Sequence, residues 1–226
     1  MPKGILLVDK PSGYTSFEVV KLLKQKFARG EKVGHGGTLD PFATGLLPVL
    51  FGREWTRKAS SLLQGEKEYV FTMRFGVETD TCDLTGRVQR VCPLPEESQI
   101  REVISLFKGK IKQEVPIFSA AKFKGKPLYY YARKGVVATQ KVREVEIYSL
   151  EFLEYLPPDA TLKVRCSGGT YVRILARDIA RSVNSCAHLI ALRRTRVSKW
   201  TVDIAHPLWS LMASDFLPLL NEEALC

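Results

Sequence analysis

The stretch from Gly34 to Gly45 holds the residues best suited to chemistry. It contains His35, Asp40 and several glycines, which allow close backbone approaches but leave few side chains to fill a core. Pro41 biases Asp40 toward an extended conformation, so a loop rather than a helix would hold this carboxylate, a possible nucleophile or base. The alternative is an ordinary glycine-rich turn with a capping aspartate, which composition alone favours because Gly, Asp and Pro dominate turns.

An arginine far along the chain could serve such a carboxylate. Arg173 and Arg177 are one helical turn apart near the start of a helix that the apolar spacing predicts from Tyr171 to Val183. A cation in the first turn opposes the helix dipole, so Arg173 is expected to have a carboxylate or phosphate partner. The alternative is an arginine that faces solvent.

The elements that must position these residues follow from the apolar periodicity. Thr15 and Glu18 have the spacing of a capping box, which predicts a helix with Phe17 and Leu23 on its apolar face. Apolar residues alternate with others from Tyr69 onward, which is typical of a strand, although Tyr69 could simply be a core tyrosine. Further strands are predicted at residues 4–8, 87–91 and 162–166, and a further helix after Pro95. Because no repeat or clear linker divides the chain, we expect one α+β domain over residues 1–226.

Composition limits the classes of function. The 226 residues are 45% hydrophobic, enough for a sizeable core, and no apolar run approaches the roughly 20 residues that cross a bilayer. The start of the chain is too weakly apolar for a signal peptide, so we expect a cytoplasmic protein. The five cysteines lack a Cys-x-x-Cys pair and the three histidines lack ligand spacing, so neither a disulfide framework nor a metal site is predicted.

Basic residues point to a polyanionic partner. Lys and Arg number 34 against 24 Asp and Glu, a formal net charge of +10 that favours nucleic acid, although many basic proteins bind none. Within residues 108–143 cations are interleaved with tyrosines, a combination that suits phosphates and exposed bases; the alternative is a solvated, poorly packed insertion. Residues 187–200 form a second basic segment. The residues expected to contact RNA are Lys122, Lys124, Lys126, Arg133, Arg193 and Arg194.

Several segments resemble the TruB-type tRNA pseudouridine-55 synthases, the family that includes the RNA-guided enzyme dyskerin. They follow the order of that family over nearly the whole chain. They include Gly4-Ile-Leu-Leu-Val-Asp-Lys-Pro-Ser-Gly13, Val33-Gly-His-Gly-Gly-Thr-Leu-Asp-Pro41, Lys67-Glu-Tyr69, Thr79-Asp-Thr-Cys-Asp83, Gly169-Thr-Tyr-Val-Arg173 and His188-Leu-Ile-Ala-Leu-Arg-Arg194.

The resemblance implies an activity and a set of site residues. It implies that the protein isomerises uridine to pseudouridine at position 55 in the tRNA T loop, as a monomer and without a cofactor. Asp40 would be the catalytic carboxylate, Arg173 would pair with it, and Tyr69 would stack on the target uracil. The other implied roles are substrate binding by His35, lining of the uridine pocket by Asp80, Tyr171 and Leu192, and support of the loop by Lys10.

The implied fold is a mixed, mainly antiparallel sheet with flanking helices and a central catalytic cleft. Residues 108–143 would form an insertion that grips the tRNA. The chain departs from the family at Gly36, where relatives usually carry Thr or Ala, and this glycine predicts a looser loop. No residues remain for the C-terminal PUA domain of many members, so we expect the catalytic domain alone. Two alternatives stay open: an RNA-binding module without catalysis, and an enzyme directed by a guide RNA.

Overall fold

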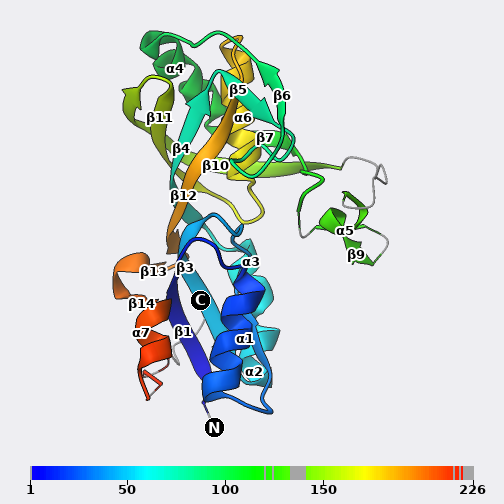
Figure 1. Ribbon diagram of the computed structural model, residues 1–226, viewed down its shortest axis with the longest axis vertical. Helices are drawn as coiled ribbons and strands as arrows, with labels where there is room; N and C mark the ends of the chain where they lie inside the picture. The colour runs from blue at the N-terminus through cyan, green and yellow to red at the C-terminus, as the bar shows by residue number, and fades with distance from the viewer. Residues whose placement is uncertain are drawn as a thin grey trace. The chain divides into compact units, whose positions relative to one another are not determined.

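The computed structural model describes residues 2–119, 121–123, 125–132, 141–215, 217–218 and 220. The chain divides into two compact units (Figure 1). The first unit comprises Met1–Tyr69 and Leu192–Cys226, and the second comprises Val70–Ala191. The single domain over residues 1–226 and its central cleft stay predictions. No helix within these described residues is both long enough and apolar enough to cross a membrane.

Strand β3 is the centre of the first unit. Its apolar side chains from Leu46 to Phe51 are fully buried. β1 and β2 both pair with β3 in the antiparallel direction. β12 pairs with the start of β3 in the parallel direction. The elements of this unit are β1 (Gly4–Lys10), α1 (Ser16–Phe27), β2 (Val33–His35), β3 (Thr44–Phe51), α2 (Arg53–Arg57), α3 (Ala59–Gln64), β13 (Trp200–Thr201), η2 (Val202–Ile204), β14 (His206–Pro207) and α7 (Leu208–Ala213). Strands β4 (Lys67–Phe75) and β12 (Ala187–Val197) have residues in both units.

Helix α1 begins as its sequence predicts. The Thr15 hydroxyl accepts the Glu18 N–H at 3.1 Å, and the Glu18 carboxylate accepts the Thr15 N–H at 2.7 Å, which completes the capping box. Val19, Val20 and Leu23 are buried, whereas Phe17 is 70% exposed. The predicted apolar face was therefore wrong at Phe17, because the buried residues Val19, Val20 and Leu23 centre on a face of the helix from which Phe17 is turned away. α1 and α2 each contact β2, and α7 lies beside β1 and β14 (Figure 1).

The second unit is built on a long antiparallel hairpin. β10 pairs with β11 on one side and with β7 on the other. Helix α6 packs on β7 and α4 (Figure 1). The elements are β5 (Val77–Thr79), β6 (Val88–Val91), α4 (Glu97–Val103), η1 (Ile104–Phe107), β7 (Gly109–Glu114), β8 (Lys122–Phe123), β9 (Lys126–Pro127), α5 (Leu128–Ala132), β10 (Val142–Leu156), β11 (Asp159–Cys166) and α6 (Val172–Ser182). Because β7 and the start of β10 belong to the sheet, only part of residues 108–143 can be an insertion.

The predicted α+β class and mixed sheet are confirmed. The strand order is β14-β1-β3-β12 in the first unit and β12-β4-β11-β10-β7 in the second. β1 with β14 and β3 with β12 are parallel pairs, whereas β1 with β3 and β10 with its neighbours are antiparallel. Tyr69, Phe71, Met73 and Phe75 of β4 are all buried, as their alternation predicts.

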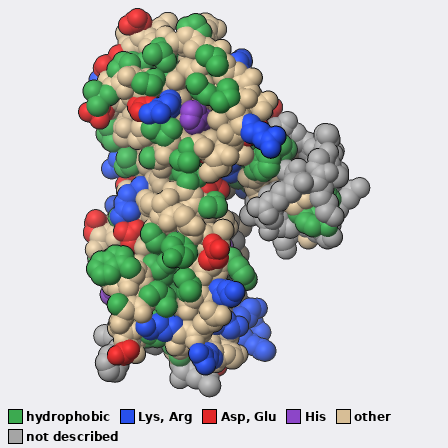
Figure 2. All heavy atoms as spheres, viewed as in Figure 1, with side chains coloured by type: hydrophobic (Ala, Val, Ile, Leu, Met, Phe, Trp, Pro, Cys, Tyr) green, Lys and Arg blue, Asp and Glu red, His purple; other side chains and the backbone are tan. Residues whose placement is uncertain are grey.

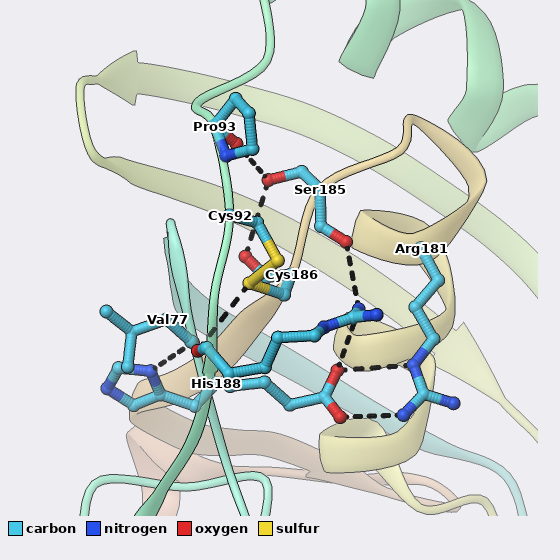
Figure 3. Close-up of a disulfide and its surroundings, with 9 residues drawn as sticks. Val77, Cys92, Pro93, Arg181, Ser185, Cys186 and His188 are labelled. Atoms are coloured by element: carbon cyan, nitrogen blue, oxygen red, sulfur yellow. Dashed lines mark hydrogen bonds and ion pairs between the residues drawn. A yellow bond between two sulfur atoms is a disulfide. The ribbon is translucent and has the colours of Figure 1, made fainter.

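A disulfide joins Cys92 to Cys186 in the second unit (Figure 3), a crosslink that the sequence analysis did not predict. The two cysteines are 94 residues apart, but both bond to one glycine: the Gly76 N–H donates to the Cys186 carbonyl, and the Cys92 N–H donates to the Gly76 carbonyl, each at 2.9 Å. Ser185 adds a bond from its hydroxyl to the Pro93 carbonyl at 2.7 Å. Spacing in the sequence could not reveal this pair, because the β5–β6 hairpin brings it together.

Removing this crosslink should destabilise the protein. A disulfide that closes a long loop restricts the unfolded chain, and its loss typically lowers the free energy of unfolding by about 2–4 kcal/mol. We expect a reductant to lower the melting temperature of the wild-type protein and to leave a Cys92→Ala, Cys186→Ala double variant unchanged, as measured by calorimetry. Equal melting of the wild-type protein with and without reductant would contradict the crosslink.

Candidate functional site

The loop between β2 and β3 is fixed at its first residues by backbone and side-chain packing. The Gly36 N–H donates to the Pro48 carbonyl at 2.8 Å, and Gly36 is buried. A Cβ on Gly36 would lie 2.9 Å from the Leu62 Cβ, so the Leu62 side chain occupies the space that a larger residue needs. The predicted looseness at Gly36 was therefore wrong, because this glycine is packed beneath α3.

The backbone around Asp40 is held from both sides. The buried Leu39 donates its N–H to the Ser16 hydroxyl at 2.8 Å, at the start of α1. The Ala43 N–H donates to the Asp40 carbonyl at 3.1 Å, which closes a tight turn, and the Gly13 N–H donates to the Pro41 carbonyl at 2.9 Å. Asp40 itself is partly exposed. The loop therefore presents a carboxylate from a backbone that is bonded on each side of it.

Lys10 lies fully buried next to this turn. Its ammonium donates to the carbonyls of Pro11 at 2.9 Å, Tyr14 at 2.7 Å and Pro41 at 3.2 Å. Burial lowers the pKa of Lys10 to about 8; Asp40 opposes this effect and Arg194 adds to it. Lys10 therefore ties the end of β1 to the residue that follows Asp40, as a loop-supporting residue should.

Arg194 is also fully buried and bonds to the same loop. Its guanidinium donates to the carbonyls of Leu46 at 2.7 Å, Gly37 at 3.1 Å and Thr38 at 3.4 Å. The expected RNA contact of Arg194 was therefore wrong, because no part of this side chain reaches the surface. Alternation along β12 explains the error, since neighbouring side chains of a strand point to opposite faces.

Arg193, on the opposite face of β12, keeps an exposed side chain. Its accessibility is 42%, and its guanidinium forms a two-point ion pair with Asp9 at 3.0 and 2.7 Å. Its contact with RNA stays a prediction. Lys122 and Lys126 belong to the β8–β9 hairpin, and Lys124 and Arg133 lie outside the described residues. Their RNA contacts stay predictions as well.

The remaining site residues of the first unit are largely buried. His35 lies in β2, and its Nδ1 accepts the Gly37 N–H at 3.4 Å. Burial lowers the pKa of His35, and the positive charge of Arg194 lowers it further, which favours the neutral imidazole. Tyr69 and Leu192 are each 7% exposed. Their roles at the base stay predictions.

Arg173 at the start of α6 is buried in the second unit, so the solvent-facing alternative was wrong. Its guanidinium donates to the carbonyls of Thr81 at 2.8 Å and Phe118 at 3.0 Å, and it lies 3.5 Å from a carboxylate oxygen of Asp83. The expectation of a carboxylate partner is confirmed with Asp83. The pairing of Arg173 with Asp40, a residue of the other unit, stays a prediction.

Asp83 is the residue that the sequence reasoning missed. It is buried, and its carboxylate accepts the Thr81 hydroxyl at 2.7 Å, the Thr85 N–H at 2.9 Å and the Thr85 hydroxyl at 2.6 Å. The sequence could have indicated Asp83, because it is the second acid of the segment Thr79-Asp-Thr-Cys-Asp83 and follows Asp80 closely. Asp80 is instead exposed, and its carboxylate accepts the Arg87 N–H at 2.8 Å. The place of Asp80 in a uridine pocket stays a prediction.

The start of α6 is anchored to β7 through Gln113. This fully buried amide accepts the Tyr171 N–H at 3.0 Å and donates to the Tyr171 carbonyl at 3.3 Å. One turn further on, Arg177 pairs with Glu114 at 3.0 Å and with Asp178 at 2.8 Å. The position of Arg173 is therefore set by its own bonds and by the anchored helix that carries it.

Comparison with known proteins identifies the family. A model described as the N-terminal domain of TruB family pseudouridylate synthase matches residues 23–172. A protein of Caldicellulosiruptor saccharolyticus named tRNA pseudouridine synthase B is 44% identical over 220 residues, 96% of this chain and 75% of that protein. One of Bordetella avium with the same name is 45% identical over 214 residues, 93% of this chain and 87% of that protein. The chain belongs to the TruB family.

Solved structures similar to this TruB family member show the same fold. The protein in the crystal structure of a Cbf5-Nop10-Gar1 complex matches with a TM-score of 0.72 and 32% identity, over 93% of this chain and 54% of that one. An H/ACA RNP bound to a substrate RNA containing 2′-deoxyuridine matches with a TM-score of 0.69 and 30% identity, over 93% and 52%. The chain therefore spans about half the length of these structural relatives.

A substitution at Gly45 tests how closely β3 approaches Arg194 of β12 in this TruB family protein. Its φ is +102°, and an added Cβ would lie 2.8 Å from the Arg194 nitrogen and 2.9 Å from the Arg194 carbonyl carbon. We expect Gly45→Ala to lower the free energy of unfolding by about 1–3 kcal/mol, from backbone strain and overpacking together. Gly30→Ala is the matched control for denaturant melts, because Gly30 has a φ of +85° and nothing within 4 Å of the added Cβ. Equal losses in both variants would contradict the close contact.

Lys10 should leave a signature in the dependence of stability on pH. Its folded pKa of about 8 lies below the ordinary 10.5, so between these values the folded chain binds fewer protons than the unfolded chain and stability rises with pH. Relative to Lys10→Met, the wild-type free energy of unfolding should increase by on the order of 2 kcal/mol between about pH 7 and about pH 10. Urea melts across this range measure it, and a constant difference would mean that Lys10 titrates normally.

Proposed function

We propose that this TruB family protein converts uridine to pseudouridine in the T loop of tRNA, at position 55, with Asp40 as the catalytic carboxylate. The observation that carries the proposal is the placement of Asp40 in a loop whose backbone is bonded on both sides of it. Relatives named tRNA pseudouridine synthase B, 44–45% identical over nearly the whole chain, support tRNA as the substrate.

The reaction is an isomerisation that a single carboxylate can assist. The bond between N1 and C1′ breaks, the uracil rotates, and C5 bonds to C1′ while its proton moves to a ring nitrogen. The Asp40 carboxylate would act as a nucleophile at C1′ or as a base at C2′. No atoms enter or leave, so the proposal requires no second substrate.

The carboxylate must stay ionised while water is excluded. Burial raises the pKa of a carboxyl group, and a neighbouring cation opposes that rise. We propose that Arg173 supplies this cation by pairing with Asp40. Asp83 and the carbonyls of Thr81 and Phe118 hold the Arg173 guanidinium in one orientation, which supports a positioning role. Lys10 adds a second cation on the side of Pro41.

The target uridine has to leave its stack before it reaches Asp40. Extrusion of a base costs a few kcal/mol, which stacking and polar contacts in a pocket offset. Tyr69 would supply the stacking ring and His35 would hold the flipped nucleotide or its vacated place. The other residues proposed to line the pocket are Asp80, Tyr171 and Leu192.

Exposed cations support binding of a polyanion. Figure 2 shows Lys and Arg side chains over the α1 and α2 side of the first unit. The exposed basic residues of these helices and the segment between them are Lys21, Lys24, Lys26, Arg29, Lys32, Arg53 and Arg57. Phosphate contacts by such residues, and by Arg193 and the β8–β9 hairpin, would position the T arm. We propose that the protein acts as a monomer in the cytoplasm.

A guide-directed enzyme is the second candidate. The similarity to a protein of an H/ACA RNP bound to a substrate RNA, with a TM-score of 0.69 and 30% identity, favours it. Turnover of a tRNA transcript by the purified chain, without added RNA or protein, separates the two candidates. Activity only after a guide RNA is added would favour the second.

Asp40→Asn tests the proposed chemistry. An amide keeps nearly the same shape but is neither a nucleophile nor a base, so we expect no detectable pseudouridine and tRNA affinity within about threefold of wild type. Digestion to nucleosides followed by chromatography measures the product, and filter binding measures affinity. Asp203→Asn, at an exposed aspartate of the first unit, is the control and should retain full activity. Wild-type turnover by Asp40→Asn would contradict the assignment.

A further inference from the structure

The Arg194 side chain forms hydrogen bonds to both ends of the Asp40 loop. Its guanidinium donates to Gly37 and Thr38, shortly before Asp40, and to Leu46, shortly after it. One rigid group thus joins the two arms of the loop. These hydrogen bonds of the guanidinium go to main-chain carbonyls, so the side chain stabilises the backbone conformation of the loop.

The backbone of Arg194 contacts the same loop end. Arg194 faces Gly45 in the parallel pairing of β12 with β3. The two chains approach so closely that a Cβ on Gly45 would lie 2.8 Å from the Arg194 nitrogen. Main chain and side chain of one residue therefore fix where β3 begins and where the preceding loop runs.

The chemistry of this position requires an arginine. A planar guanidinium presents donors in a fixed fork and can reach carbonyls in different directions, whereas a lysine ammonium is a point charge on a flexible stem. The site is fully buried, so water cannot readily replace a lost donor, and an unpaired buried carbonyl is unfavourable. Arg194 bonds to Leu46 through Nε and to Gly37 through Nη2, so the single nitrogen of a lysine is expected to lose at least one arm of the loop.

We propose that Arg194 is a positioning residue for pseudouridine formation, which clasps residues 37–38 and 46 and so fixes the carboxylate of Asp40 before RNA binds. The inference rests on the proposed function, because it assigns the purpose of the clasp to Asp40. A loop that loses one arm should displace the carboxylate, and a displacement of about 1 Å can reduce a catalysed rate about 100-fold.

Single-turnover kinetics on a T-arm hairpin test the proposal with Arg194→Lys. We expect the rate of the bound complex to fall about 100-fold while the Kd for the hairpin stays within about twofold. Val197→Ala is the matched control: it truncates a fully buried side chain of the same strand, in the apolar cluster with Leu46 and Leu50, and this side chain has no hydrogen-bond donor. Both variants are measured well below their melting temperatures. A rate for Arg194→Lys equal to that of Val197→Ala overturns the proposal that Arg194 positions Asp40.

A second readout does not depend on turnover. Chymotrypsin cleavage after Phe42 requires the loop to open, so Arg194→Lys should be cut there several-fold faster than wild type or Val197→Ala, as mass spectrometry of the fragment ending at residue 42 would show. Wild-type protein without activity would defeat the proposed function, and the cleavage rates would then decide on Arg194 alone. Unchanged cleavage in Arg194→Lys overturns the proposal. If that variant does not fold, Arg194→Gln, which buries no cation, takes its place in both measurements with the same expected results.

Discussion

Two fully buried cations, Lys10 and Arg194, are satisfied by carbonyls on and around the Asp40 loop. A buried charge is strongly unfavourable unless hydrogen bonds replace its water. Movement of the loop would therefore break one bond of the Lys10 ammonium, to Pro41, and two bonds of the Arg194 guanidinium, to Gly37 and Thr38, inside the core. The position of the candidate catalytic carboxylate follows from this constraint, and a loop rich in glycine becomes a fixed support.

The second unit applies the same principle to Arg173. Its guanidinium is buried against Asp83 and two carbonyls, and Gln113 anchors the start of the helix that carries it. Asp40 in the first unit and Arg173 in the second are thus each positioned by contacts within their own unit. In the proposed function the exposed cations, rather than the buried ones, would bind the RNA that carries the uridine.

Local patterns in the sequence predicted what depends on neighbours along the chain. The capping box at Thr15, the alternation after Tyr69 and the position of the Asp40 loop are of this kind. Contacts between distant segments were not predictable in this way. Arg193 and Arg194 look alike in sequence, yet strand alternation exposes one and buries the other. Gly36 predicted a looser loop because the residue that fills the space beside it, Leu62, lies in α3, far from Gly36 in the sequence.

If the buried cations fix the Asp40 loop, the loop is ordered before RNA binds. Amide hydrogen exchange of the RNA-free wild-type protein, resolved to residues 36–43, measures this order. The bonded amides of Gly36, Leu39 and Ala43 should exchange nearly as slowly as those of β3, because local opening would break bonds of the two buried cations. Exchange of these amides at the rate of an unstructured glycine-rich peptide, with β3 still protected, would show that the loop is not ordered without RNA.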